Sequence, residues 1–403
     1  MEEICSREKC TGCSACYNVC PKSAISMVES GAAGYVYPQV DASKCIDCNL
    51  CRKVCPVFHP VNLNEPLKAY AATCKNESHL VGSASGGAAS SIAEIIIRNG
   101  GVVYGSVMLN YKNVSHCRFT SVEEMYMMRG SKYVQSSIGS TYRQAKEDLK
   151  AGKDVLFTGT ACQIAGLRNY LHRDYENLWC LDLVCHGVPS QKLLRDNVEF
   201  IYAQCGQTPA RELKVHFRDI LSTQTSNLDL RYGVFTENTI PRKLQIFPKN
   251  TYITAFMAGL TFRENCYSCP YAQPKRTADI TVADFWGYLG NEIPSGWGIS
   301  LLLPSSAKGL ALCEKVLPYM NFEERPVNEA VKGNGQLQHP SLRPEERDRF
   351  LIEYERIGDQ CYKPLLKSYL RKYRKRQLKE LIRKIIHSTP VSSFVWNKLR
   401  HNK

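Results

Sequence analysis

The stretch CTGCSACYNVCP, residues 10–21, decides how the N-terminal part of this chain folds. The same spacing of cysteines, C-x2-C-x2-C-x3-C followed by proline, returns in residues 45–56. This run is typical of proteins that bind cubane iron–sulfur clusters through cysteine thiolates, with the fourth cysteine of each run reaching the other cluster. The sequence therefore predicts two [4Fe-4S] clusters and a chain that moves electrons.

Each iron of a cubane needs one thiolate, and a tight loop with three cysteines supplies three corners of the cube, so the fourth must come from farther away. The predicted ligands form a first cysteine group, Cys10, Cys13, Cys16 and Cys55, and a second cysteine group, Cys45, Cys48, Cys51 and Cys20. This is the arrangement of bacterial-type ferredoxins, which predicts a ferredoxin-like domain over residues 1–58. A pair of structural zinc sites is the alternative, but zinc sites rarely use this run in tandem.

Length and composition favour a cytoplasmic protein of several domains. The chain has 403 residues, and its 19 cysteines are numerous enough to raise the question of disulfides. Residues 1–5, MEEIC, have neither the basic nor the apolar region of a signal peptide, so we expect the thiols to stay reduced. No uninterrupted apolar run is long enough to span a bilayer.

The net charge of +14 is concentrated at the C-terminus, where residues 363–403 hold thirteen Lys and Arg against a single acid, Glu380. Apolar residues fall at near-helical spacing there: Leu366, Leu370, Tyr373, Leu378, Leu381, Ile382 and Ile385. We therefore expect residues 346–403 to form a basic amphipathic helical tail. Such a helix packs back on the protein, docks a partner, or lies at an anionic membrane surface; nucleic acid is not expected, because no nucleic-acid-binding fold is visible.

A larger domain is predicted over residues 67–345, after a Pro- and Asn-rich linker. Buried strands are expected at 102–109, 154–157 and 178–184, with a helix over 140–150 between the first two, which indicates an α/β core. Residues 213–218, 227–232 and 243–247 favour the short strands of an antiparallel insert. The fold class is thus α/β, or α+β for the whole chain.

Two of the predicted strands lead into cysteines, Cys162 and Cys185, and ligands bind beyond the carboxyl ends of strands in open α/β sheets. Cys266 and Cys269 add a further C-x2-C pair. These four residues, the third cysteine group, can hold a third [4Fe-4S] cluster. Ordinary buried cysteines and a small structural knuckle are the alternatives, and the spacing does not decide between them.

Two further segments suit an anionic cofactor. Small residues at 82–91, which include Ser85, Gly86 and Gly87, precede an amphipathic stretch and allow backbone N–H groups to approach a phosphate. Residues 129–136 combine hydrogen-bond donors with the cation of Lys132. Close helix packing and a solvated loop are the respective alternatives.

These motifs together resemble the beta subunits of coenzyme F420 hydrogenases and dehydrogenases, in the form with a fused double-cluster ferredoxin domain. The resemblance depends on motifs in the right order over most of residues 4–340: SGG at 85–87, GSKY at 130–133, GTACQ at 159–163, CHGVPS at 185–190, Cys266 with Cys269, and DFWG at 284–287. Ala161 and Ala283 depart from the usual Pro and Gly of the family. Neither departure removes a ligand or a polar side chain.

The resemblance implies FAD in the central domain and favours the third cluster. It implies FAD phosphate contacts for Ser85, Gly86 and Gly87, and contacts to the flavin or its ribityl chain for Lys132, Gln135, Ser136 and Thr160. Lys132 would stabilise the reduced flavin, and the alternative is a surface lysine paired with a carboxylate. His186 is a candidate proton relay or a structural histidine. Asp284 caps a turn or contacts the cofactor, and Arg276 and Asp279 are close enough in sequence to pair.

The chain is therefore expected to be an FAD- and iron–sulfur-dependent oxidoreductase, because clusters pass single electrons whereas a deazaflavin exchanges a hydride and a flavin converts between the two. Coenzyme F420 is one candidate substrate. Another organic acceptor, for example in polysaccharide biosynthesis, is the alternative, and a non-catalytic electron-transfer subunit is the hypothesis from a different class. The expected partner is ferredoxin or a hydrogenase or dehydrogenase subunit, with a location in the cytoplasm or at the membrane periphery.

Overall fold

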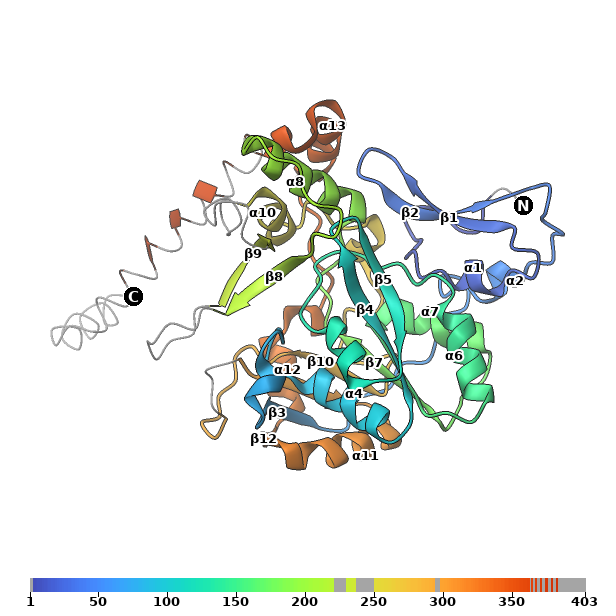
Figure 1. The fold of residues 1–403 in the computed structure, drawn as a ribbon, viewed down its shortest axis with the longest axis vertical. Coiled ribbons are helices and arrows are strands. Elements are labelled where there is room, and N and C mark those ends of the chain that lie inside the picture. The colour runs from blue at the N-terminus through green and yellow to red at the C-terminus, as the bar shows by residue number, and fades with distance from the viewer. Residues whose placement is uncertain are drawn as a thin grey trace, which may run out of the picture.

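The computed structural model describes residues 3–220, 230–236, 250–293 and 298–362, together with single positions between 364 and 382. It confirms the predicted fold class, since a small N-terminal unit is joined to an α/β body built on an eight-stranded mixed sheet (Figure 1). The predicted strand at 243–247 and most of the basic tail lie outside the described residues. No helix of the described part is long and apolar enough to cross a membrane.

The N-terminal unit is an antiparallel hairpin flanked by two short helices, as expected for a ferredoxin-like domain. The hairpin pairs β1 (Ile25–Ser30) with β2 (Tyr35–Val40), and the helices are α1 (Ala15–Val19) and α2 (Leu50–Lys53). The two cysteine runs share one backbone shape, because the residues at matching positions, Gly12 and Asp47, then Ser14 and Asn49, all have positive φ. The sequence repeat is therefore also a repeat of loop geometry.

The large sheet has a parallel centre with antiparallel margins, in the order β12-β3-β11-β10-β7-β6-β4-β5. β10, β7, β6 and β4 run parallel, and the remaining neighbours are antiparallel. The strands are β3 (Ala69–Cys74), β4 (Val102–Asn110), β5 (Asn113–Phe119), β6 (Val155–Thr160), β7 (Leu178–Leu183), β10 (Ile280–Asp284), β11 (Ser300–Pro304) and β12 (Met320–Arg325). The strands predicted at 102–109, 154–157 and 178–184 are thus confirmed.

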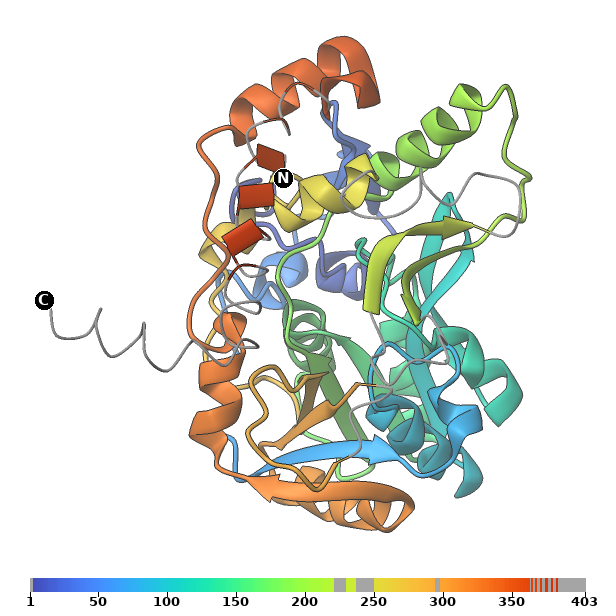
Figure 2. The same ribbon diagram turned by 90° about the vertical axis from the view of Figure 1, so that its left-hand side faces the viewer.

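Helices cover both faces of this sheet because its strands bury side chains on both sides. Val103 and Leu156 lie in the core with α4 (Ala88–Arg98) and α11 (Ala307–Val316), whereas Tyr104 and Phe157 lie in the core with α6 (Thr141–Lys150) and α7 (Ala161–Leu171). The helix expected over 140–150 is α6. Figure 2 shows these layers from the side.

A second core lies beyond one end of the sheet. It is built from α8 (Gln191–Gln204), α10 (Thr251–Met257), α13 (Arg347–Ile357) and the antiparallel pair β8 (Val215–Ile220) and β9 (Leu230–Thr236). β8 and β9 confirm the first two strands of the predicted insert, with β9 displaced towards the C-terminus. Tyr35 of the ferredoxin-like hairpin also belongs to this core. The N-terminal unit is therefore packed against the body (Figure 1).

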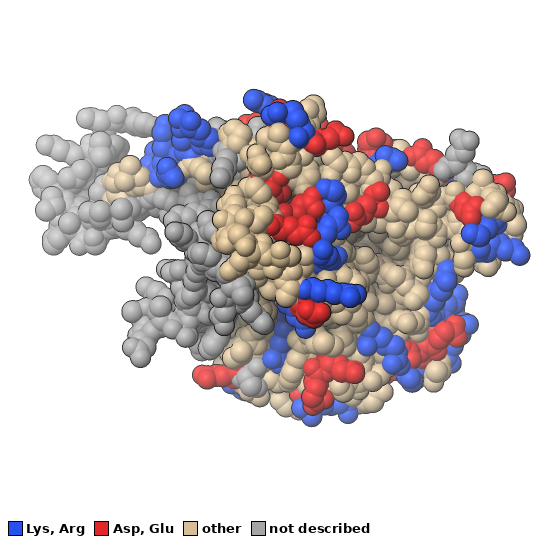
Figure 3. All heavy atoms as spheres, turned by 45° about the horizontal axis from the view of Figure 1, so that its top comes forward, with Lys and Arg blue, Asp and Glu red and all other residues tan. Residues whose placement is uncertain are grey.

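The remaining elements are short. They are the helices α3 (Glu77–Leu80), α5 (Val122–Met125) and α12 (Val327–Gly333), and 3₁₀ turns at Tyr126–Met128, Glu264–Ser268, Leu317–Tyr319, Gly335–Leu337 and Gly358–Cys361. Beyond 362, Leu370 packs partly against the second core, whereas Leu378 and Ile382 are exposed. On the face shown in Figure 3, Lys and Arg lie interspersed with Asp and Glu.

A buried ion pair crosses the centre of the sheet. Arg276 Nη2 lies 3.1 Å from Asp182 Oδ2, with 2% and 0% of the two side chains exposed, and Thr277 and Thr281 also donate to this carboxylate. The predicted pairing of Arg276 with Asp279 was wrong. Asp279 instead accepts hydrogen bonds from the Cys180 backbone and Ser306, because the strand register places Asp182 opposite Thr281, close to Arg276.

Arg276→Met is expected to lower the free energy of unfolding by about 3–5 kcal/mol, because it leaves the Asp182 carboxylate buried without its cation. The matched control is Lys68→Met, which removes an exposed pair with Glu324 and should change stability far less. Chemical unfolding under anaerobic conditions, followed by far-UV circular dichroism, measures both variants. Equal losses would contradict a dominant role for the buried pair.

Candidate functional site

The thiols of the first cysteine group, which the spacing assigns to one cluster, lie near one another. Burial raises the pKa of Cys16 well above its usual value, and Cys13, Cys10 and Cys55 raise it further, so the four thiols lie close together. A fifth cysteine, which the sequence analysis did not assign, adjoins them: a hydrogen bond from Cys5 is the main cause that lowers the pKa of Cys10 to about 6 and that of Cys55 to about 7. The group therefore suits one cubane.

The second cysteine group lines a cavity of its own. Its four members surround this space together with Pro21, Ala24, Ile25, Val40 and Leu50, among other residues. The apolar side chains suit a cluster, because they keep water from the irons and leave the thiolates as ligands. Cys48 is exposed, so this is the cluster site nearest to solvent.

The third cysteine group is brought together from three separate segments. β6 and β7 are parallel neighbours with Thr160 opposite Leu183, so Cys162 and Cys185 leave the same edge of the sheet. Burial raises the pKa of Cys185 well above its usual value, and the thiols of Cys266, Cys162 and Cys269 raise it further. Four such thiols are deprotonated together only beside positive charge, which the irons of a cluster supply.

The described residues contain no three His, Cys, Asp or Glu side chains close enough to hold one metal ion. A cubane core is wider than a single ion, so its thiolates stand farther apart.

The first and third cysteine groups are neighbours. Gly166 of α7 lies against Cys13, since a Cβ atom at Gly166 would stand 2.9 Å from Cys13 Sγ. Tyr271 is buried, and its pKa is raised by burial first and then by thiols of both groups, Cys162 and Cys13 foremost. A glycine inside a helix costs stability and was the one sequence signal for this close approach. Tyr271 thus lies near thiols of both cysteine groups, and Gly166 of α7 lies against the first.

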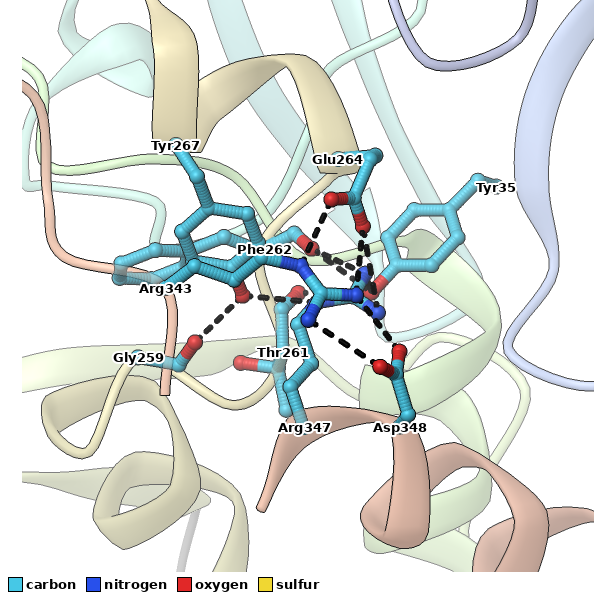
Figure 4. A network of polar contacts seen from close by, with 9 residues as sticks. All are labelled: Tyr35, Gly259, Thr261, Phe262, Glu264, Tyr267, Arg343, Arg347 and Asp348. Atoms are coloured by element: carbon cyan, nitrogen blue, oxygen red, sulfur yellow. Dashed lines mark hydrogen bonds and ion pairs between the residues drawn. The ribbon is translucent and has the colours of Figure 1, made fainter. Parts of the chain in front are cut away.

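The segment with Cys266 and Cys269 is held by two distant elements (Figure 4). The Phe262 carbonyl accepts hydrogen bonds from Tyr35 of β2 and from Arg347 of α13, at 3.2 and 2.7 Å. Arg347 also donates to the Tyr267 hydroxyl at 2.8 Å and lies 3.6 Å from Glu264. No sequence pattern predicted this role for Arg347, because its partners are far away along the chain.

The two segments expected to suit an anionic cofactor lie side by side. A Cβ atom at Gly130 would stand 3.3 Å from the Gly82 carbonyl, and Arg129 donates to the Val81 carbonyl. Gly87 caps α4 with a left-handed backbone, and a Cβ atom at Gly86 would meet the Ala72 carbonyl at 2.3 Å. The buried Ser85 hydroxyl has no hydrogen-bond partner among the described residues. These features fit a phosphate at the N-terminus of α4.

Lys132 lies partly buried in the same region. Its ammonium donates to the carbonyls of Met128 and Arg129, at 2.6 and 2.9 Å. Burial lowers its pKa to about 7. No carboxylate of the described residues pairs with it, so the alternative of a surface salt bridge is not supported.

A chain of polar contacts leads from this region to the third cysteine group. Ser136 and the Thr158 carbonyl bind the two ring nitrogens of His116, each at 2.9 Å. Burial lowers the pKa of His116 to about 4 and keeps it neutral. Gln163 donates to the Ser136 carbonyl at 3.2 Å and completes a capping box with Thr160, whose hydroxyl lies 3.2 Å from Cys162 Sγ. His116 was not singled out by the sequence.

The other predicted residues have different neighbours. Gln135 donates to the Thr11 carbonyl, at 3.0 Å, in the first cluster loop. His186 is exposed and its carbonyl accepts from Ser341. Asp284 pairs with Arg218 of β8 at 2.9 Å. The roles of Gln135, Ser136, Thr160 and His186 towards FAD or protons stay predictions.

The fold and the cysteine groups define an iron–sulfur electron-transfer protein, and comparison with known proteins identifies its parts. Residues 9–58 match the 4Fe-4S dicluster domain, which confirms two [4Fe-4S] clusters. Residues 152–330 match the family formed by the C terminus of the coenzyme F420 hydrogenase/dehydrogenase beta subunit. The match confirms, over these residues, the resemblance inferred from the motifs.

Two other comparisons add to this. None of the curated proteins matches the chain. Among solved structures, a chain of the F420-reducing [NiFe] hydrogenase complex from Methanosarcina barkeri aligns with 74% of this chain and 91% of its own, with 19% identity and a TM-score of 0.42.

Replacing one ligand of the second and one of the third cysteine group tests these two assignments. Cys48→Ser and Cys162→Ser should each lower the iron content by about four per chain, because a cubane with three thiolates is readily lost. Cys117→Ser is the control, since Cys117 lies in β5 and belongs to none of the groups. Iron and acid-labile sulfide in anaerobically purified protein measure the result. An unchanged iron content in Cys162→Ser would contradict the third cluster site.

Proposed function

We propose that this protein is an iron–sulfur flavoprotein oxidoreductase, which passes electrons between [4Fe-4S] clusters and an organic substrate through FAD. The observation that carries the proposal is that the two glycine-containing segments, 82–87 and 129–132, lie side by side, and that the first of them holds an unpartnered buried Ser85 hydroxyl just before the N-terminus of α4. The redox families matched by residues 9–58 and 152–330 agree with it.

The three cysteine groups and the FAD site would pass electrons in sequence. The second cysteine group would hold the cluster closest to solvent, the first group the next, and the third group the cluster nearest the FAD site. Ser85 and the first N–H groups of α4 would bind phosphate, and Lys132 would place a cation beside the ring system. FAD supplies the exchange between single electrons and a hydride.

The polar chain of His116, Ser136 and Gln163 would fix the distance between the FAD site and Cys162. His116 is buried, neutral and bonded at both nitrogens, so it is suited to rigidity and not to proton transfer. We place the organic substrate at the side of the flavin away from Cys162. Coenzyme F420 is the first candidate substrate, and another organic acceptor is the second.

The electron donor would be a small redox protein such as ferredoxin, docking beside Cys48. A partner subunit of a larger redox complex is the other possibility. The basic tail offers a contact for a partner or for an anionic membrane surface.

Cofactor analysis tests the proposal directly. Anaerobically purified protein should contain about twelve irons, since each of three cubanes holds four, and about one FAD. Dithionite should bleach its visible spectrum, and oxidised coenzyme F420 should restore it if the deazaflavin is the substrate. About eight irons without flavin would contradict the proposal and indicate a non-catalytic electron-transfer subunit.

Ser85→Ala tests the FAD site without disturbing the fold. Because the hydroxyl has no partner among the described residues, its removal breaks no described hydrogen bond and stability should hold. FAD affinity should fall by about tenfold, the value of one lost hydrogen bond to a charged group. Ser305→Ala is the matched control, because its hydroxyl is also buried and has no described partner. Ser305 follows the C-terminal end of β11, away from the proposed FAD site. Equal FAD affinity in both variants would exclude Ser85 as a contact.

A further inference from the structure

Arg263 is a buried cation without a carboxylate. None of its surface is exposed, and no acidic side chain of the described residues forms an ion pair with it. The other two most buried arginines differ, because Arg276 pairs with Asp182 and Arg347 lies 3.6 Å from Glu264. A buried charge is costly unless something of opposite sign compensates it. Arg263 therefore requires an anion within the protein.

The hydrogen bonds of Arg263 point to the first cluster loop. Its Nε donates to the Cys10 carbonyl at 2.7 Å, and its Nη1 lies 3.3 Å from Gln135 Oε1. Its guanidinium lies 4.2 Å from the ring centre of Tyr37. The remaining nitrogen, Nη2, is buried and has no hydrogen-bond partner among the described residues. A Cβ atom at Gly12 would stand 3.2 Å from the guanidinium carbon, so the loop lies directly on this group.

Arg263 also adjoins the third cysteine group. Its carbonyl accepts a hydrogen bond from the backbone of Cys266 at 2.9 Å. Arg263 therefore contacts both cysteine groups, through its guanidinium at the first cluster loop and through its backbone at Cys266.

We propose that Arg263 is the shared counter-cation of the clusters held by the first and third cysteine groups, and that it raises the reduction potentials of both. The part that concerns the third cluster rests on the proposed function. A cubane with four thiolates is an anion, and each reduction adds a negative charge. A fixed cation in a buried site stabilises the reduced cluster more than the oxidised cluster, because the reduced cluster carries the larger negative charge. The second cysteine group, which Arg263 does not contact, keeps the lower potential, so electrons that enter there run downhill to the body.

Three variants test this assignment. Arg263→Gln removes the charge, Arg263→Lys retains it, and Arg143→Gln is the matched control. Arg143 also donates to carbonyls of the ferredoxin-like unit, those of Asn18 and Tyr17 at 2.8 Å each, but it has no described contact with a cysteine of the three groups. Redox titration followed by electron paramagnetic resonance measures the cluster potentials, and Cys48→Ser identifies the signal of the second group by its loss.

Arg263→Gln should lower the potential of the first-group cluster by an amount that changes its reduced-to-oxidised ratio about tenfold, or about 59 mV for a one-electron couple. The second-group cluster should not move, and Arg263→Lys should retain most of the wild-type value. No shift, an equal shift of all clusters, or the same shift in Arg143→Gln would overturn the proposal. If Arg263→Gln does not fold, wild-type protein decides: a first-group potential that is not above the second-group potential overturns it.

The iron content separates this proposal from the proposed function. About eight irons in the wild type would remove the third cluster, as each cubane holds about four, and with it the statement on that cluster. The predicted shift of the first-group potential in Arg263→Gln would still be tested independently. About twelve irons with no shift of the first-group potential would contradict the proposed role of Arg263 and leave the three-cluster relay in place.

Discussion

The carbonyl of Phe262 is the point on which the rest of this structure depends. It accepts hydrogen bonds from Tyr35 in the ferredoxin-like hairpin and from Arg347 in α13, two residues separated by most of the chain. The backbone held in this way continues into Arg263 and then into Cys266 and Cys269. The Cys185 loop closes on the same residue, because a Cβ atom at Gly187 would stand 2.6 Å from the Phe262 ring. One short segment therefore fixes the cluster unit against the α/β body.

This arrangement explains why the N-terminal unit is packed against the α/β body and not merely connected to it by the linker. Gln135, Arg263 and Arg143 all donate to backbone carbonyls of its cluster loops or of α1. Hydrogen bonds from charged groups to carbonyls are stronger than neutral ones. They leave the thiols free for iron, and hold the loops at a fixed distance from the third cysteine group. An electron-transfer chain needs such fixed spacing more than it needs a stable domain interface.

The sequence predicted features that depend on neighbouring residues, and it missed contacts between residues that are far apart along the chain. The first and second cysteine groups followed from loop spacing, whereas for the third group the spacing did not decide. The meeting of Cys162 with Cys185 followed from the parallel strands that end before them. The pairing of Arg276 with Asp279 was wrong because nearness along the chain is a poor guide inside a sheet, where register brought Asp182 closer. Arg263, Arg347 and His116 escaped notice because each acts through contacts with segments far away in sequence. The FAD contacts of Lys132 and Ser85 stay predictions, although the structure brings their segments together.

The Pro- and Asn-rich stretch that the sequence predicts to be a linker, which includes residues 59–64, also binds the α/β body. Asn64 exchanges two backbone hydrogen bonds with Arg276, at 2.9 and 2.8 Å, and the His59 carbonyl accepts from Asn169. Val61 and Leu63 pack against the same small core as Cys162 and Cys269, that of Ala161, Ala165 and Tyr271. Residues that join the two parts of the chain thus also add apolar side chains to the surroundings of the third cysteine group. Exclusion of water strengthens charge interactions, so the connection between the two parts also favours a charged cofactor at this group.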